Sequence, residues 1–155
     1  MTNLEKIAFK NNLKKFGLAI LRQRIVTAQE AMDQAQEAAN SEEKSSAGDK
    51  YETGRAMGQL QKEMLGRQLA EYAKEMSALQ AIVSDSLCDR GGPGAFIQAK
   101  EIAFFVSAGL GRQELEGRRI LFVSPLAPLA RSLQNKKTGD SILFNGVNML
   151  IECVY

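Results

Sequence analysis

Histidine is absent from this 155-residue chain, tryptophan is also absent, and cysteine and proline are scarce. The lack of histidine excludes Ser-His and Cys-His nucleophilic chemistry and histidine-based metal sites. The two cysteines, Cys88 and Cys153, lie far apart in the sequence and lack metal-ligand spacing. We therefore expect two reduced thiols without a disulfide, in a cytoplasmic protein.

Long apolar runs are missing as well, since none approaches the ~18 residues that a membrane-spanning helix requires. No apolar block follows the lysine-containing segment 1–15, so we expect neither a secretory signal nor a membrane partner. The net charge is only +2, so any contact with nucleic acid would need local basic patches. The low aromatic content of 6% suits helices that pack through Leu, Met and Ala.

Segment 1–17 is polar and carries the lysines Lys6, Lys10, Lys14 and Lys15. These lysines could contact a nucleic acid or an acidic partner, but the pattern favours a solvated helix face. Gly17 predicts a weak joint before the next segment.

Apolar residues then recur at alternating spacings of three and four, which is typical of a coiled-coil seam. The first run is Leu18, Leu21, Ile25, Ala28, Met32, Ala35 and Ala39. The second run, which shifts phase near Leu65, is Met57, Leu60, Met64, Leu65, Leu69, Tyr72, Met76, Leu79 and Val83. Two such runs predict an antiparallel helical hairpin. The glycines at 54, 58 and 66 favour a close approach of the two helices.

Residues 40–50 interrupt the pattern with turn formers and predict the tip of the hairpin, near 42–54. Asp49 and Glu52 admit two interpretations that do not exclude each other. An Asp followed three residues later by Glu is a capping box for the second helix. The same pair could instead present free carboxylates at the tip. Glu42 and Glu43 favour a solvated loop, with a contribution to the acidic tip as the alternative.

The C-terminal half changes periodicity after a linker at 84–94. Segments 96–107 and 119–123 read as strands, and Ser124-Pro125 as the start of a short helix. Asn145-Gly146 between two apolar runs predicts a hairpin with a type I′ turn. The expected class is therefore α+β, with a helical hairpin at 1–83, the linker, and an antiparallel sheet domain with one short helix at 95–155.

This order of features resembles the GreA/GreB family of bacterial transcript-cleavage (elongation) factors. The tip stretch Gly48-Asp49-Lys50-Tyr51-Glu52 is similar to the family's Gly-Asp-x-x-Glu. The C-terminal resemblance lies in Val123-Ser124-Pro125-Leu126, Leu129-Ala130-Arg131-Ser132-Leu133, Lys136-Lys137-Thr138-Gly139-Asp140 and the final Tyr155.

The resemblance implies an FKBP-like C-terminal domain that docks on RNA polymerase, near the mouth of its secondary channel, through residues such as Ser124 and Pro125. It further implies that the hairpin enters the channel and that Asp49 and Glu52 help to hold a second Mg²⁺ in the polymerase's active centre. The ion would promote cleavage of backtracked RNA. Such a factor stimulates the polymerase's own endonuclease activity and is not itself an enzyme.

Five basic residues on the expected hairpin could contact the RNA 3′ segment or the polymerase, although ordinary coiled-coil surface charge explains them equally well. They are Arg22, Arg24, Arg55, Lys62 and Arg67.

Three stretches depart from the family pattern. Thr53-Gly54-Arg55-Ala56 replaces an Asn-Ala-Glu-Tyr-like run, segment 40–47 lengthens the approach to the tip, and Leu126-Ala127-Pro128 reads as an insertion. Two other functions therefore stay open. One is a non-cleaving regulator that occupies the same channel, and the other is a chaperone-like protein that binds peptides through its sheet domain.

Overall fold

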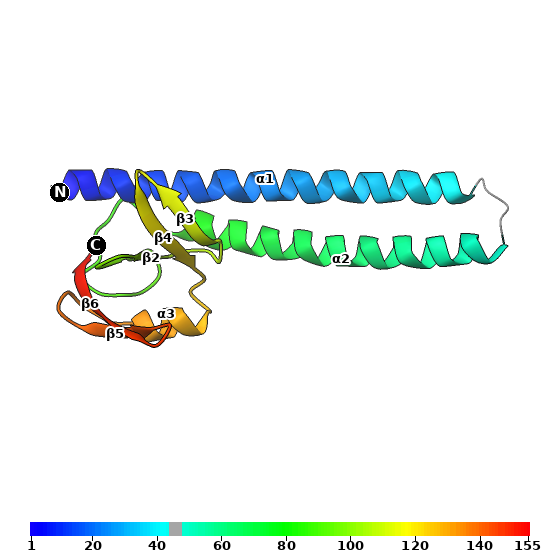
Figure 1. Cartoon of the computed structure of the whole chain (residues 1–155). Coiled ribbons are helices and arrows are strands. Elements are labelled where there is room, and N and C mark those ends of the chain that lie inside the picture. Colours follow the sequence, from blue (N-terminus) through cyan, green and yellow to red (C-terminus); the bar gives the residue numbers. More distant parts are fainter. Residues whose placement is uncertain (44–47) are drawn as a thin grey trace. The chain divides into compact units, whose positions relative to one another are not determined.

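The computed structural model describes residues 1–43 and 48–155, without the side chains of 42–51 (Figure 1). Two long helices, α1 (Asn3–Glu43) and α2 (Gly48–Ala81), precede a six-stranded sheet that carries one short helix, α3 (Pro128–Leu133). The strands are β1 (Phe96–Ala99), β2 (Ala103–Val106), β3 (Gly111–Leu115), β4 (Arg118–Val123), β5 (Ser141–Phe144) and β6 (Val147–Val154). The predicted α+β class is confirmed.

Contacts divide the chain into two compact units. The sheet unit comprises Met1–Leu18 and Glu75–Tyr155, and the hairpin unit comprises Ala19–Lys74. The base of each long helix therefore belongs to the same unit as the sheet.

The strand order is β3-β4-β2-β1-β6-β5, and every pairing is antiparallel except that of β2 with β4. This parallel pair departs from the fully antiparallel sheet that the sequence predicts. It arises because β3, a strand missed in the sequence, lies between β2 and β4 in the chain but pairs on the outer side of β4. The predicted turn is confirmed, since Asn145 and Gly146 have φ values of 49° and 76°.

The first part of α1 packs on an aromatic face of the sheet. The ring of Phe9 meets that of Phe96 edge-on, with 5.2 Å between centroids, and Phe96 in turn lies 4.9 Å from Tyr155. The guanidinium carbon of Arg118 lies 4.5 Å from the Phe9 centroid, and the same group donates a 2.7 Å hydrogen bond to Gln98. Burial raises the pKa of the Tyr155 hydroxyl above its usual value. The first and last elements of the chain thus share one core.

The opposite face of the sheet packs against α3. Ala130 and Leu133 of this helix join a buried cluster that includes Phe104, Val123 and Ile151. The sheet unit therefore has three layers: the base of α1, the sheet, and α3.

Lysines from α1 hold the end of α2. Lys14 donates hydrogen bonds of 3.0 and 2.7 Å to the carbonyl oxygens of Gln80 and Ile82. Lys10 is fully buried and donates a 2.8 Å hydrogen bond to the carbonyl of Ser86. Burial lowers the pKa of the Lys10 amine, and the neighbouring Cys88 thiol opposes that shift. The solvated face predicted for these lysines is therefore wrong for Lys10 and Lys14. Lys14 binds carbonyls at the end of α2, and Lys10 binds a carbonyl in the segment beyond it.

Gly17 lies inside α1, which runs through this position without a break. The predicted joint is therefore wrong. A Cβ atom at Gly17 would lie 2.8 Å from Leu79 and 3.2–3.3 Å from Leu110 and Phe122. The glycine permits a close approach between α1 and the core of the sheet unit.

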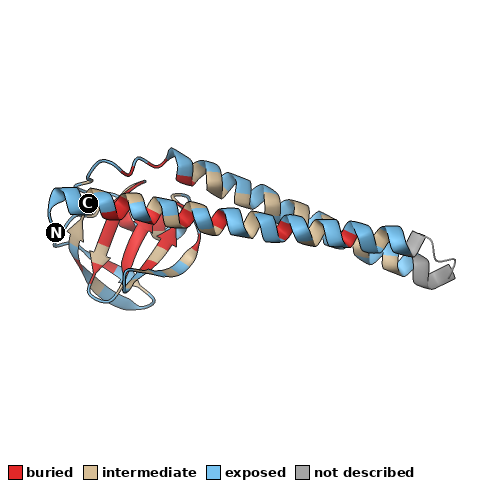
Figure 2. Ribbon diagram, turned by 90° about the horizontal axis from the view of Figure 1, so that it is seen from above, coloured by how far each residue is buried: buried red, intermediate tan, exposed pale blue. Residues whose placement is uncertain are grey.

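In the hairpin unit, the seam predicted for α1 is confirmed by burial at Leu21, Ala28 and Ala35, which recur along the helix as red bands (Figure 2). The first part of the seam predicted for α2 is wrong, and so is its last residue, Val83, which is exposed and lies beyond the end of α2. Met57, Leu60 and Met64 are 66%, 65% and 67% exposed.

Gly54, Gly58 and Lys62 instead occupy the half-buried positions of α2, and the Lys62 amine donates a hydrogen bond to Gln36 of α1. Nothing lies within 4 Å of a Cβ built at Gly58 or Gly66, so the close helix approach predicted at these glycines is also absent.

Two helix boundaries differ from expectation. The predicted break at 40–50 is shorter, because α1 continues to Glu43 and α2 begins at Gly48. The short C-terminal helix begins at Pro128 rather than Pro125. The Ser124 hydroxyl accepts a 3.3 Å hydrogen bond from the backbone N–H of Leu126, which closes a turn instead of capping a helix.

We expect alanine substitution to have opposite effects at two glycines. Gly17→Ala should lower the free energy of unfolding by about 1 kcal/mol, because overpacking costs ~1–3 kcal/mol and exceeds the gain in helix propensity. Gly58→Ala should raise it by about 0.5–1 kcal/mol, because its methyl group meets open space. Urea unfolding of both variants measures the change in the free energy of unfolding. Changes of the same sign in the two variants would contradict the close approach at Gly17.

Loss of the Lys14 amine should loosen the end of α2. We expect Lys14→Met to lower the free energy of unfolding by about 2 kcal/mol, because two carbonyls lose charge-assisted hydrogen bonds. Lys15→Met is the matched control at an exposed neighbouring position, with an expected change within about 0.5 kcal/mol. Urea unfolding that finds the two variants equally stable would refute this role for Lys14.

Candidate functional site

The predicted acidic pair lies at the start of α2, at the end of the hairpin unit opposite its two connections to the sheet unit. The 25 residues of α1 from Ala19 to Glu43 span about 40 Å at 1.5 Å per residue. Because α2 begins at Gly48, positions 49 and 52 both fall within the first two turns of this helix. Residues three apart lie on the same side of a helix.

Glu52 is exposed to solvent. The side chains of Asp49, Glu42 and Glu43 lie outside the described residues. A helix that begins at Gly48 places Asp49 in the first turn rather than before it. A capping box does form at the start of α1, where the hydroxyl of Thr2 accepts from the N–H of Glu5 and the Glu5 carboxylate accepts from the N–H of Thr2.

That reciprocal bond lowers the pKa of Glu5. The capping and ligand roles of Asp49 and Glu52 both stay predictions.

Carboxylate oxygens are the hard ligands that Mg²⁺ prefers, and the ion commonly uses only one or two of them from a protein. Among the side chains that the structure describes, no group of three Cys, Asp or Glu residues converges. Of the predicted pair, only the carboxylate of Glu52 is among these described side chains.

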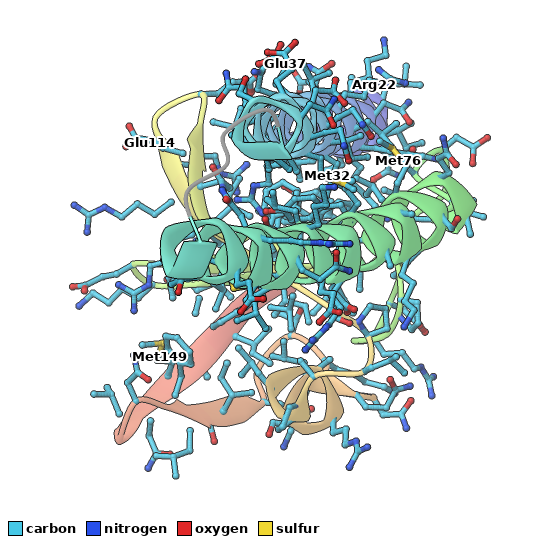
Figure 3. All side chains as sticks on the ribbon, turned by 90° about the vertical axis from the view of Figure 1, so that its right-hand side faces the viewer. Arg22, Met32, Glu37, Met76, Glu114 and Met149 are labelled. Atoms are coloured by element: carbon cyan, nitrogen blue, oxygen red, sulfur yellow. The ribbon has the colours of Figure 1, made fainter. Side chains whose placement is uncertain are left out.

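The five predicted basic contacts do not all lie on one face of the hairpin unit. Arg22 and Arg24 are two residues apart, which places them about 200° apart around α1. Figure 3 shows Arg22 on the outer side of that helix, while Met32 points toward α2. Arg24 lines a shallow groove with Tyr72.

On α2, Arg55 and Lys62 are seven residues apart and share a face. Lys62 bonds to Gln36, and the guanidinium of Arg67 lies 4.0 Å from the carboxylate of Glu63. Arg55 and Lys62 therefore lie two turns apart on one face of α2, and Arg22 lies on another side of the hairpin unit.

The predicted docking residues, Ser124 and Pro125, are half-buried in the turn between β4 and α3. Leu126 next to them is highly exposed. Singly exposed apolar residues are common on protein surfaces, so the docking role of this turn stays a prediction.

A cleft of about 460 Å³ in the sheet unit was missed in the sequence. Its floor is apolar and includes Ile102, Phe144 and Met149. Its rim is charged and includes Glu101, Arg112, Glu114 and Arg119. Glu114 on β3 and Met149 on β6 are labelled in Figure 3. The sequence did contain a signal for β3, because charged residues alternate in 111–115. Glu116-Gly117 follows this segment and forms the β3–β4 turn, with positive φ values of 54° and 73°.

No helix among the described residues is long and apolar enough to cross a membrane. No protein-family model and no curated protein matches the chain. Among solved structures, the chain is similar to one described as the structure of the transcription factor Gfh1. The alignment covers 88% of this chain and 90% of that chain, with 14% sequence identity and a TM-score of 0.38. A likeness at this level assigns neither a family nor a function.

Proposed function

We propose that this chain is a transcription elongation factor that binds RNA polymerase and stimulates cleavage of backtracked RNA. The hairpin unit enters the secondary channel, and Asp49 and Glu52 lend carboxylates to a Mg²⁺ ion held jointly with the polymerase. The observation that supports this proposal most directly is the position of these residues in the first turns of α2, at the end of a long solvated hairpin.

The residues of this chain act as ligands and contacts, because the reaction belongs to the polymerase. When bound, Mg²⁺ polarises a phosphodiester and lowers the pKa of a bound water. The exposed carboxylate of Glu52 supplies a hard oxygen ligand without prior desolvation. Arg55 and Lys62, which share one face of α2, contact the RNA 3′ segment, and the turn at Ser124-Pro125 with Leu126 contacts the polymerase surface.

Removing the charge at the tip should abolish stimulation while binding persists. We expect Asp49→Asn/Glu52→Gln to slow RNA cleavage in backtracked complexes at least tenfold, because even indirect loss of metal-ligand support costs about 10–100-fold. Cleavage of labelled RNA by the purified cognate polymerase measures the rate, and a polymerase-binding assay run in parallel should give an unchanged affinity.

Glu63→Gln provides the matched control, since it neutralises another exposed carboxylate of α2 away from the tip. It should cleave like the parent protein. If the double tip variant also cleaves like the parent, the proposed role of the carboxylates fails.

A non-cleaving channel regulator is the second candidate, and Arg55 is the residue that favours it. This exposed cation lies three residues after Glu52, close enough to pair with its carboxylate and compete with a metal ion. Under this alternative, the parent protein inhibits transcription and never shortens backtracked RNA. Arg55→Ala would then restore cleavage.

A peptide-binding function is favoured only by the cleft of the sheet unit, whose apolar floor and charged rim suit an extended chain. It requires that the protein bind unfolded peptides and have no measurable affinity for RNA polymerase. Met149→Glu should abolish such binding, and fluorescence anisotropy with labelled peptides measures it.

A further inference from the structure

Three large apolar side chains of the hairpin unit stand in solvent on adjacent turns of α2. They are Met57, Leu60 and Met64, which we call the distal stripe, and each is about two-thirds exposed. Their spacing of three and four residues places them on one side of the helix. A contiguous apolar surface that is exposed to solvent commonly marks an interaction site.

The distal stripe borders a groove of about 590 Å³ within the hairpin unit. Apart from Gln61, small residues form the rest of the groove, namely Ala35, Ala38 and Ala39 of α1 together with Gly54 and Gly58 of α2. A Cβ atom at Gly58 would meet nothing within 4 Å, so the groove is open at this point. One surface thus carries both large apolar side chains and the holes that can receive them, which is the requirement for a self-complementary interface.

We infer that two copies of this chain associate through the distal stripe, with the two α2 helices antiparallel about a twofold axis at Leu60. In this register Leu60 packs on Leu60 of the second copy, and Met57 packs near Met64 of the second copy. The pairing repeats by symmetry, so both stripes are covered at once.

The charges beside the stripe favour the antiparallel direction. In the register centred on Leu60, Glu52 lies beside Arg67 of the second copy, and Arg67 beside its Glu52. Both residues are exposed, and the ion pair of Arg67 with Glu63 is long, at 4.0 Å. A parallel pairing would place Glu52 against Glu52 and Arg67 against Arg67, which like-charge repulsion disfavours.

This inference uses the hairpin unit alone and does not rest on the proposed function. Sedimentation equilibrium of the full chain should show a dimer, and Leu60→Glu should weaken association at least tenfold because two carboxylates would meet at the axis. Val26→Glu is the matched control, since Val26 is an exposed apolar residue of α1 outside the groove, and it should leave association unchanged. Circular dichroism checks that each variant keeps its helices.

Charge reversal tests the register. Glu52→Arg and Arg67→Glu should each weaken association, and the double variant should restore it. In a Cys88→Ser/Cys153→Ser background, Leu60→Cys should form a disulfide-linked dimer under oxidised glutathione, whereas Val26→Cys should associate without forming the disulfide.

The inference is overturned if the parent protein is monomeric up to about 1 mM, because only association with a dissociation constant above about 1 mM would then be missed. It is also overturned if Val26→Glu disrupts association as much as Leu60→Glu. Association that survives Leu60→Glu, or a monomer that instead binds a helix of another protein through the stripe, would assign this surface to a different occupant.

Discussion

Two amines from α1 bind the end of α2 and the segment that follows it, and the arrangement of the sheet unit depends on this attachment. The last carbonyls of a helix lack intrahelical partners and carry partial negative charge. Lys14 satisfies two carbonyls there, and Lys10 reaches the chain beyond the helix. Phe9 and Leu13 lie beside these lysines in the sequence and are buried. The base of α1 therefore contributes polar and apolar contacts together, and both depend on the same rotation of the helix.

Features that depend on local chemistry could be predicted from the sequence. Asn145-Gly146 gives a type I′ turn because both residues tolerate positive φ. The prediction for the seam of α1 is correct because apolar residues, and no glycines, occupy its inward positions. The seam of α2 failed where Gly54 and Gly58 take those positions, because hydrophobicity patterns assign no inward role to a residue without a side chain. β3 was missed because edge strands that alternate charged residues have no apolar signature.

Features that depend on distant partners could not be predicted in this way. The role of Lys10 is set by a carbonyl 76 residues later in the chain, and periodicity contains no record of that partner. The same holds for the cleft, whose walls come from strands at opposite edges of the sheet order. The position of the acidic pair was foreseeable, because two matched helical runs define the turn between them. The chemical role of the pair could not be predicted, because acidic residues are favoured both at the start of a helix and as ligands of Mg²⁺.

The sheet unit is interrupted in the sequence by the whole hairpin unit, and this has a consequence for the order of events on the ribosome. Contacts inside the hairpin unit form between residues made close together in time. The sheet unit closes only after the hairpin unit has been made, when Tyr155 exchanges backbone hydrogen bonds of 2.7 and 2.9 Å with Phe96. Until then the apolar base of α1, which precedes the hairpin unit and all six strands in the chain, has no sheet to cover it. The nascent chain must therefore carry an uncovered amphipathic helix while the hairpin unit and then the strands are translated.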